Sequence, residues 1–178
     1  MARHRFVGEG MQDRVQVQNQ GTEPVAFELA VPGEHNRLNA AAALAALDAA
    51  DVPRADAEAA LQRFRGVDRR LELVADRGGV RVYDDYGHNP TEIPATLRTA
   101  RELTDGRVIA VYQPHVYERT RQLHRELGEA LGLADLAVVT DVVGGRDPQP
   151  GVTGKLVLDD IPREVRRGWA PTLEDAAR

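Results

Sequence analysis

Hydrophobic and polar positions change their spacing several times along the second half of the chain. Alternation within residues 69–86 predicts two strands joined by a hairpin turn at Asp76-Arg77-Gly78-Gly79. Continuous apolar cores within residues 107–113 and 135–143 are typical of buried parallel strands. Segments with helical spacing separate these strands, at residues 91–103 and 118–132. This β-α-β-α-β order predicts an α/β fold with a parallel sheet and right-handed crossovers.

The first part of the chain has a different pattern. The alternating run 14–20 indicates a strand edge or a loop, and residues 24–33 predict a strand that ends at Pro32-Gly33. Alanine and leucine predominate in residues 34–52, and residues 54–64 repeat the pattern, so both segments are expected to be helices. Gly66 is the expected stop of the second helix.

The change in pattern near Gly66 predicts a domain boundary. We expect one domain over residues 1–68 and another over residues 69–178. The last segment, "KLVLDDIPREVRRGWAPTLEDAAR", shows no clear closing strand. The second domain is therefore expected to contain three parallel strands, the first of them within residues 80–86, and to be incomplete.

Composition narrows the class of protein. The 178 residues include 23 basic and 28 acidic side chains, a formal net charge of −5. This balance argues against nucleic acid as a partner, because such proteins carry a basic surface. Without cysteine there are no disulfides or thiolate metal sites. No apolar run approaches the roughly 20 residues that span a bilayer, and no leader resembles a signal peptide. Together these features predict a cytoplasmic protein that does not insert into membranes.

Three polar loops follow predicted strands: "DDYGHNP", "QPHVYERT" and "DVVGGRDPQPG". Ligands of open α/β sheets bind beyond the carboxyl ends of the strands, so these loops are expected to converge. In the first loop, Asn89, Pro90 and Glu92 have the spacing of a helix cap. Adjacent strand residues point to opposite faces, so only one of Asp84 and Asp85 is expected to face a ligand. His88 is compatible with either a binding or a structural role.

The other polar segments are less specific. His115, Arg119 and Arg121 lie near a predicted helix start, where arginine could bind a carboxylate or phosphate. A solvated basic turn is the alternative. The segment "GVTGKL" fails the phosphate-loop spacing G-x-x-x-x-G-K-[ST]. His124 shows no partner pattern and is expected to be a surface residue.

The motifs together resemble one known family. "GEHNRLNAAAALAAL", "FRGVDRRLEL", "VYDDYGHNPTEIPATL", "VYQPHVYERT" and "DVVGGRDPQPGVTGK" occur in one order, and the chain resembles the ATP-dependent Mur ligases of peptidoglycan synthesis over about residues 25–155. The resemblance implies a three-domain enzyme. The chain would hold the end of the ATP-binding central domain and an incomplete Rossmann-like C-terminal domain. Its phosphate loop and magnesium ligands are expected outside this chain, so the resemblance assigns it no metal ligands. It implies ATP, magnesium, UDP-N-acetylmuramate and L-alanine as cofactors and substrates.

The resemblance implies a role for each residue that matches a family motif. The resemblance implies ATP binding by His35, Asn36, Asn39, Arg70 and Asp85, with Asn36 on the adenine and Asp85 on the ribose. It implies amino-acid binding by His88, His115 and Arg119. Arg70, at the domain hinge near the phosphates, and His88 are the expected catalytic residues.

Two departures from the family pattern affect the expected substrate. Asn89 replaces the usual second histidine, and Val116 replaces the usual arginine after "QPH". A related ligase for another amino acid or a peptide is therefore an alternative, as in the murein-peptide recycling ligase, cyanophycin synthetase or folylpolyglutamate synthetase. A non-catalytic nucleotide-binding module is a second alternative. A dehydrogenase-type Rossmann domain is disfavoured, because no G-x-G-x-x-G follows a predicted strand.

Overall fold

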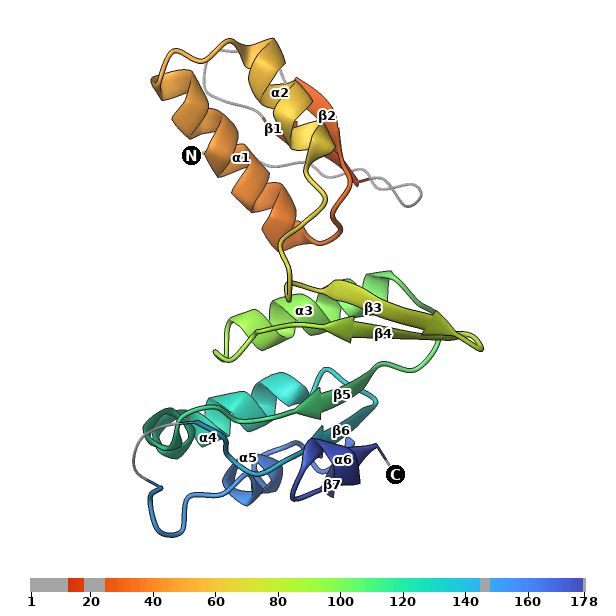
Figure 1. Cartoon of the computed structure of the whole chain (residues 1–178), viewed down its shortest axis with the longest axis vertical. Helices are drawn as coiled ribbons and strands as arrows, with labels where there is room; N and C mark the ends of the chain where they lie inside the picture. The colour runs from red at the N-terminus through yellow and green to blue at the C-terminus, as the bar shows by residue number, and fades with distance from the viewer. Residues whose placement is uncertain (1–12, 18–24, 145–147, 178) are drawn as a thin grey trace. The chain divides into compact units, whose positions relative to one another are not determined.

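The computed structural model describes residues 13–17, 25–144 and 148–177, and it divides into two compact units (Figure 1). These units are Met1–Asp85 and Tyr86–Arg178. The compact units divide after the predicted hairpin, whereas the composition changes before it. The domain boundary at residues 68/69 therefore stays a prediction.

The first unit contains a strand pair covered by two helices. β1 (Asp13–Val17) pairs antiparallel with β2 (Val25–Leu29), and α1 (Glu34–Ala49) packs against α2 (Arg54–Arg63). Their core is small and built from Leu29, Val31, Ala40, Leu44 and Ala57. Alanine at the helix contact lets the backbones approach closely, which suits the alanine-rich pattern of α1. These predicted elements are confirmed, except that residues 18–20 of the alternating run lie outside the described residues.

Gly66 does not cap α2 as expected. The helix ends at Arg63, and the next residue, Phe64, is already extended. Gly66 instead adopts a φ of +105°, which L side chains rarely adopt. It lies three residues after the helix end, and a Cβ at this position would lie 3.4 Å from a Val31 methyl group.

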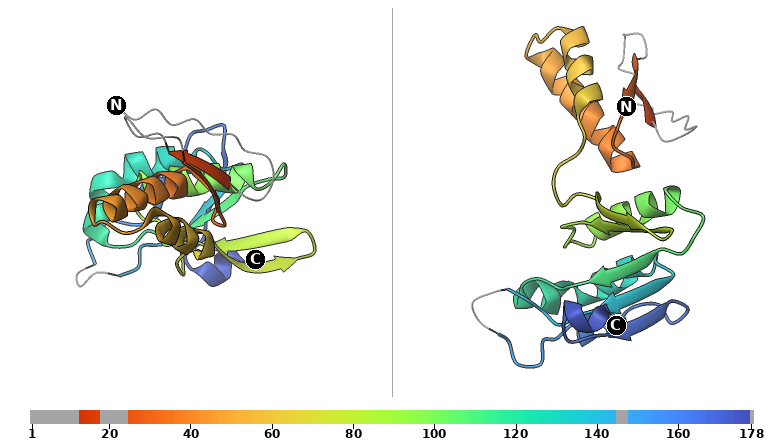
Figure 2. Two further views of the ribbon diagram at one scale, coloured as in Figure 1. Left: turned by 90° about the horizontal axis from the view of Figure 1, so that it is seen from above. Right: turned by 45° about the vertical axis from the view of Figure 1, so that its right-hand side comes forward.

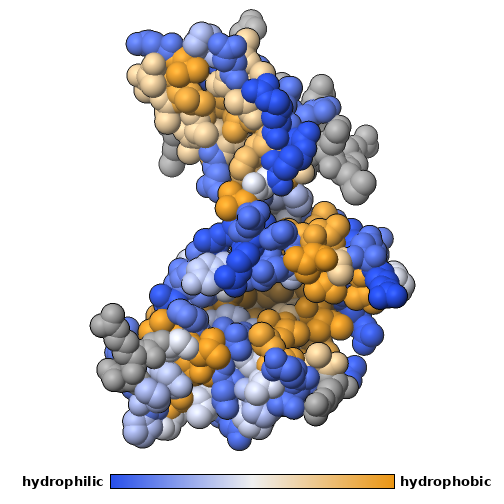
Figure 3. Space-filling model, viewed as in Figure 1, coloured by the Kyte–Doolittle hydropathy of each residue, from blue (hydrophilic) through white to orange (hydrophobic). Residues whose placement is uncertain are grey.

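The predicted hairpin of the first unit is confirmed. β3 (Glu72–Arg77) pairs antiparallel with β4 (Val80–Asp84). Arg77 faces Val80 in the register, so Gly78 and Gly79 form a two-residue turn with φ of +60° and +79°. Positive φ at both positions is the requirement of a type I′ turn. Leu73, Val74, Val80 and Val82 are exposed and contribute to the apolar surface over the hairpin in Figure 3.

The second unit is a parallel sheet with helices (Figure 2). β5 (Ile109–Tyr112), β6 (Leu136–Val139) and β7 (Arg166–Trp169) lie in the order β5-β6-β7. The helices are α3 (Glu92–Glu102), α4 (Tyr117–Leu131), α5 (Lys155–Asp159) and α6 (Leu173–Ala176). None of the described helices has the length and apolar character needed to cross a membrane.

Two sequence expectations about this sheet were wrong. Its third parallel strand is β7, in the segment expected to lack one, while residues 80–84 pair with β3. The β7 sequence "RRGW" has no apolar periodicity, so only its pairing with β6 reveals it. In addition, β5 is covered on one face only: Ile109 and Val111 are 51% and 50% exposed, whereas Tyr112 is 8% exposed.

Candidate functional site

The carboxyl end of the sheet in the second unit brings two of the polar loops together. His115 forms a parallel bridge with Val143. The Val116 N–H donates to the Val143 carbonyl at 3.0 Å, and the Val143 N–H donates to the Pro114 carbonyl at 2.9 Å. Val116 is held at a φ of +72°, which is strained for a β-branched residue. Such strain persists only where neighbouring contacts over-determine the backbone, and it concentrates at functional sites.

The loop before α3 forms the second part of this edge. The Glu92 carboxylate accepts hydrogen bonds from the backbone N–H groups of His88 (2.9 Å) and Asn89 (3.2 Å). The bond expected between the Glu92 carboxylate and the Asn89 N–H is present, but Asn89 is not the N-cap and Pro90 is not the first helical residue: α3 begins at Glu92, with Thr91 as its N-cap. These bonds fix the start of α3 and the position of His88.

The His88 ring has a defined orientation. Its Nδ1 lies 2.8 Å from the Tyr86 carbonyl oxygen and 3.7 Å from a Glu92 carboxylate oxygen, and its ring meets the Tyr86 ring edge-on at 5.1 Å. Because a carbonyl oxygen only accepts hydrogen bonds, this geometry assigns the proton to Nδ1. In the neutral ring Nε2 is then a hydrogen-bond acceptor.

The arginines of "QPHVYERT" have different surroundings. Arg121 forms an ion pair with Glu118 at 2.5 Å. Gln149 and Gln122 also donate to Glu118, and these bonds, that of Arg121 foremost, lower the Glu118 pKa to about 2. Arg119 is half-buried, and within the described residues its guanidinium forms no ion pair or hydrogen bond. Of the two, Arg119 is the cation available to an external anion.

Tyr112 lies between these groups at the end of β5. Its ring belongs to the core, and burial raises the pKa of its hydroxyl to about 12. Arg119 and Glu92 both act on that pKa, Arg119 lowering it and Glu92 raising it. Charged residues of both the first turn of α4 and the start of α3 therefore influence the Tyr112 hydroxyl.

The His115 ring depends on a glycine. A Cβ at Gly144 would overlap the Nε2 and Cδ2 atoms of His115, and Gly144 has a φ of +75°. The imidazole of His115 thus fills the place that a side chain at position 144 would take. The structure places His115 and His88 in loops of the same unit, at the ends of β5 and before α3.

We expect Gly144→Ala to displace the His115 ring. Gly151→Ala is the matched control, because Gly151 has a φ of +80° with no atom within 4 Å of its Cβ position. Both changes should cost about 1–2 kcal/mol of stability, the usual cost of a left-handed alanine. Only Gly144→Ala should shift the NMR signals of the His115 ring. Unchanged His115 signals in Gly144→Ala would contradict the contact.

The expected ATP-binding residues of the first unit lie in α1 and around the hairpin. His35, Asn36 and Asn39 occupy the first turns of α1, His35 and Asn36 half-buried and Asn39 exposed. The Asn36 side-chain amide donates to the Pro32 carbonyl at 2.7 Å. That bond orients the side chain so that its carbonyl oxygen is the acceptor, which is the group an adenine amino group requires.

Arg70 and Asp85 lie at the base of the hairpin. Arg70 is exposed and sits between Arg69 and Leu71, whose φ values of +58° and +48° are both left-handed. The Asp85 carboxylate accepts from the Leu71 N–H at 2.9 Å. Asp84 instead pairs with Arg69 at 3.2 Å on the surface. The two aspartates thus have different partners, and Asp85 has a structural bond that sequence reasoning did not anticipate.

Other candidate segments in the second unit are structural. His124 is half-buried and pairs through Nδ1 with Asp160 at 2.5 Å, so the expectation of a surface residue without a partner was wrong. In "GVTGKL", a Cβ at Gly154 would overlap the Thr140 carbonyl, and the Lys155 ammonium lies 4.2 Å from the Trp169 ring. This segment therefore packs α5 against the sheet.

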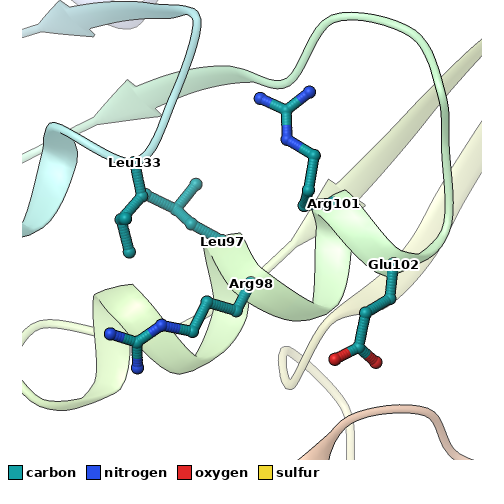
Figure 4. Close-up of a pocket in the computed structure, with 5 residues that line it drawn as sticks. All are labelled: Leu97, Arg98, Arg101, Glu102 and Leu133. Carbon is teal, nitrogen blue, oxygen red and sulfur yellow. The ribbon is translucent and has the colours of Figure 1, made fainter.

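A hollow of about 400 Å³ lies apart from these residues (Figure 4). It is lined by Leu97, Arg98, Arg101, Glu102 and Leu133. Arg101 is engaged by Asp135 at 2.6 Å and by the Gly106 carbonyl at 3.0 Å. The hollow borders the C-terminal half of α3, whereas His88 and Glu92 lie at the start of that helix. Among the described residues, no cluster of three His, Asp or Glu side chains could hold a metal ion.

Sequence reasoning missed the contributions of Tyr86, Tyr112 and Glu92 to the surroundings of His88 and Arg119. Tyr86 lies within the "DDYGH" motif, and its proximity to His88 was the available signal. Tyr112 ends an apolar strand, where a tyrosine ring is expected in the core. Only its position between two charged side chains distinguishes it.

Comparison with known proteins identifies relatives of both units. The family described as "Mur ligase, glutamate ligase domain" matches residues 69–178. The chain is 53% identical over 150 residues to a UDP-N-acetylmuramate–L-alanine ligase of Kineococcus radiotolerans, and 44% identical over 153 residues to one of Streptomyces avermitilis. These alignments cover 83% and 85% of the chain, but only 32% and 33% of the relatives. The chain thus spans about a third of their length.

Solved structures show the same relationship. A UDP-N-acetylmuramate–alanine ligase from Thermotoga maritima matches 93% of the chain and 36% of its own length, with a TM-score of 0.73 and 31% identity. A Mycobacterium tuberculosis folylpolyglutamate synthase, complexed with ADP and AMPPCP, covers 97% of the chain and 38% of its own length. Its TM-score is 0.69 at 22% identity, which shows a shared fold alone.

Proposed function

Because the chain belongs to the Mur ligase family, we propose that it carries the amino-acid-binding part of an ATP-dependent ligase that joins L-alanine to UDP-N-acetylmuramate in peptidoglycan synthesis. The names of the relatives from Kineococcus and Streptomyces support this substrate pair. Since the chain spans about a third of those relatives, the phosphate loop and the magnesium ligands are proposed to lie outside these 178 residues. An enzyme that consumes ATP and a UDP-sugar is proposed to act in the cytoplasm.

The observation that carries the proposal is the environment of Arg119. A half-buried guanidinium without a partner among the described residues is suited to bind a carboxylate that arrives with the substrate. It lies in the first turn of the 15-residue helix α4, where the helix dipole also favours a negative charge. The α-carboxylate of an amino acid fits both features. His115 and His88 are proposed to complete the amino-acid pocket.

The proposed reaction has two steps. The sugar-linked carboxylate attacks the γ-phosphorus of ATP, and ADP leaves, which forms an acyl phosphate. The amino group of alanine then attacks the acyl carbon, phosphate leaves, and the nitrogen loses a proton. We assign that proton to Nε2 of His88, because Nδ1 is occupied by the Tyr86 carbonyl. Arg70 is proposed to stabilise charge near the phosphates.

ATP is proposed to contact the first unit. The Asn36 side-chain carbonyl would accept from the adenine amino group, with His35 and Asn39 beside it on α1. Asp85 would accept the ribose hydroxyls through its carboxylate. Proximity and orientation of the reactants would supply most of the rate enhancement.

A ligase for another amino acid is the second candidate. Val116 provides no cation where family members usually have arginine, and its backbone is bonded to Val143. Steady-state assays of the full-length enzyme with UDP-N-acetylmuramate, ATP and a panel of amino acids decide between L-alanine and another amino acid as the substrate. L-alanine should give the highest kcat/KM. A different preferred amino acid would select the second candidate, and nucleotide binding without ligation would indicate a non-catalytic module.

The 178-residue chain alone is expected to show no enzymatic ATP turnover. Its sequence contains no G-x-x-x-x-G-K-[ST] loop, so the β- and γ-phosphates have no cradle. Phosphate release by the purified chain with ATP, magnesium and both substrates measures this directly. Magnesium-dependent turnover of about one per second or more, the lower end for kinases, would contradict it.

A further inference from the structure

Tyr112 combines a buried ring with an unpaired hydroxyl. Alternation along β5 directs Ala110 and Tyr112 to the core, whereas Ile109 and Val111 face away from it. The ring packs in the cluster that includes Ile93 and Leu97 of α3 and Leu127 of α4. The ring is thus part of a core that contains residues of both α3 and α4.

The hydroxyl itself is not sealed inside that core. Within the described residues it forms no hydrogen bond, and it is absent from the solvent-inaccessible polar atoms that lack a partner. A tyrosine hydroxyl normally finds a partner when its ring is buried. The tip of Tyr112 therefore reaches accessible space at the carboxyl end of β5 and retains its hydrogen-bonding capacity.

Tyr112 is the last residue of β5, and Arg119 lies in the first turn of α4, the next helix along the chain. Arg119 and Glu92 are both near enough for their charges to act on the ionisation of the Tyr112 hydroxyl. Glu92 is already bonded to the N–H groups of His88 and Asn89, whereas Arg119 has no bond among the described residues. The hydroxyl is protonated at neutral pH, as any tyrosine is, and burial raises its pKa further, to about 12. The site thus presents one O–H donor beside one free guanidinium.

We propose that Tyr112 is an additional amino-acid-binding residue, whose hydroxyl donates a hydrogen bond to the same α-carboxylate that Arg119 binds. This inference rests on the proposed function and adds a residue to its pocket. A carboxylate accepts about four hydrogen bonds, so it can receive an arginine fork and a phenol together. The hydroxyl would supply part of the binding that Val116 cannot provide.

The test uses the full-length enzyme and compares L-alanine with L-alaninamide, which lacks the carboxylate. Tyr112→Phe preserves the ring and the core, so the variant is expected to fold. It should lower kcat/KM for L-alanine about tenfold, the effect of a lost hydrogen bond to a charged group. With L-alaninamide, the same variant should match the wild type within about twofold. A purely structural role would lower both values equally.

Tyr117→Phe is the matched control, because the Tyr117 hydroxyl donates to the Val142 carbonyl at 3.5 Å within the same loop region. It should leave the ratio of the two kcat/KM values unchanged. Equal losses with both substrates in Tyr112→Phe, or no loss with L-alanine, would overturn this inference while the proposed function stands. A wild-type enzyme that ligates no amino acid would overturn both.

Discussion

Arg119→Ala in the full-length enzyme is expected to raise the KM for the amino acid by about ten- to a hundredfold, because charge-assisted hydrogen bonds contribute roughly 1.5–3 kcal/mol. The KM for ATP should change little, since the expected ATP residues belong to the other unit. If domain closure depends on the same contact, kcat should fall as well. Steady-state kinetics with each substrate varied in turn separates these effects.

Arg121→Ala is the matched control for this prediction. Arg121 lies half a turn further along α4 and carries the same charge, but it is paired with Glu118 on the surface. Because exposed ion pairs contribute little, its loss should hardly change stability and should leave both KM values close to wild type. An unchanged amino-acid KM and kcat in Arg119→Ala would remove this residue from the pocket. Equal effects of the two substitutions would indicate general electrostatic attraction.

Val116→Arg in the same enzyme tests whether a cation at position 116 strengthens binding of the amino acid. The pocket would then hold two guanidinium groups, as expected for the family pattern. A lower KM for the amino acid would indicate that, in other members of the family, the arginine at position 116 and the one matching Arg119 bind the carboxylate together. The left-handed φ of Val116 disfavours any β-branched residue, so arginine should be tolerated there at least as well as valine.

The second large effect is expected at Asp85. Asp85→Ala should raise the KM for ATP by about ten- to a hundredfold if the carboxylate holds the ribose. The structure adds a stability cost of about 1–3 kcal/mol, because the Leu71 N–H loses its acceptor. Denaturant unfolding measures that loss separately from the kinetics.

Asp85→Asn separates the two roles. An asparagine carbonyl can still accept from Leu71, so stability should be near wild type, while the charge-assisted bonds to the ribose are lost. Asp84→Asn is the control, because Asp84 pairs with exposed Arg69 on the surface of the hairpin. It should leave the KM for ATP unchanged. Equal ATP effects of Asp84→Asn and Asp85→Asn, with stability preserved in both, would count against the ribose assignment.

The local elements follow from the sequence because their causes are local. Alanine and leucine content predicted the helices now seen as α1 and α2, and helical spacing predicted α3 and α4. Paired glycines at positions 78 and 79 predicted the hairpin, since its turn requires positive φ twice. Glu92 three residues after Asn89 predicted the bond between the Glu92 carboxylate and the Asn89 N–H, although α3 begins two residues later than that spacing implied. The order of the five motifs along the sequence was specific enough to indicate the family.

Contacts between distant segments were decided only by the tertiary structure. β7 is a strand because its backbone pairs with β6, although Arg166 and Arg167 obscure any apolar pattern. Arg119 and Arg121 are equivalent in sequence, but Arg121 pairs with Glu118, a carboxylate that also accepts a hydrogen bond from the distant Gln149, whereas Arg119 has no such partner among the described residues. Tyr112 reads as an ordinary core residue until α3 and α4 place Glu92 and Arg119 near its hydroxyl. Local spacing specifies helices and turns, whereas the partner of a side chain depends on packing between segments that the spacing does not describe.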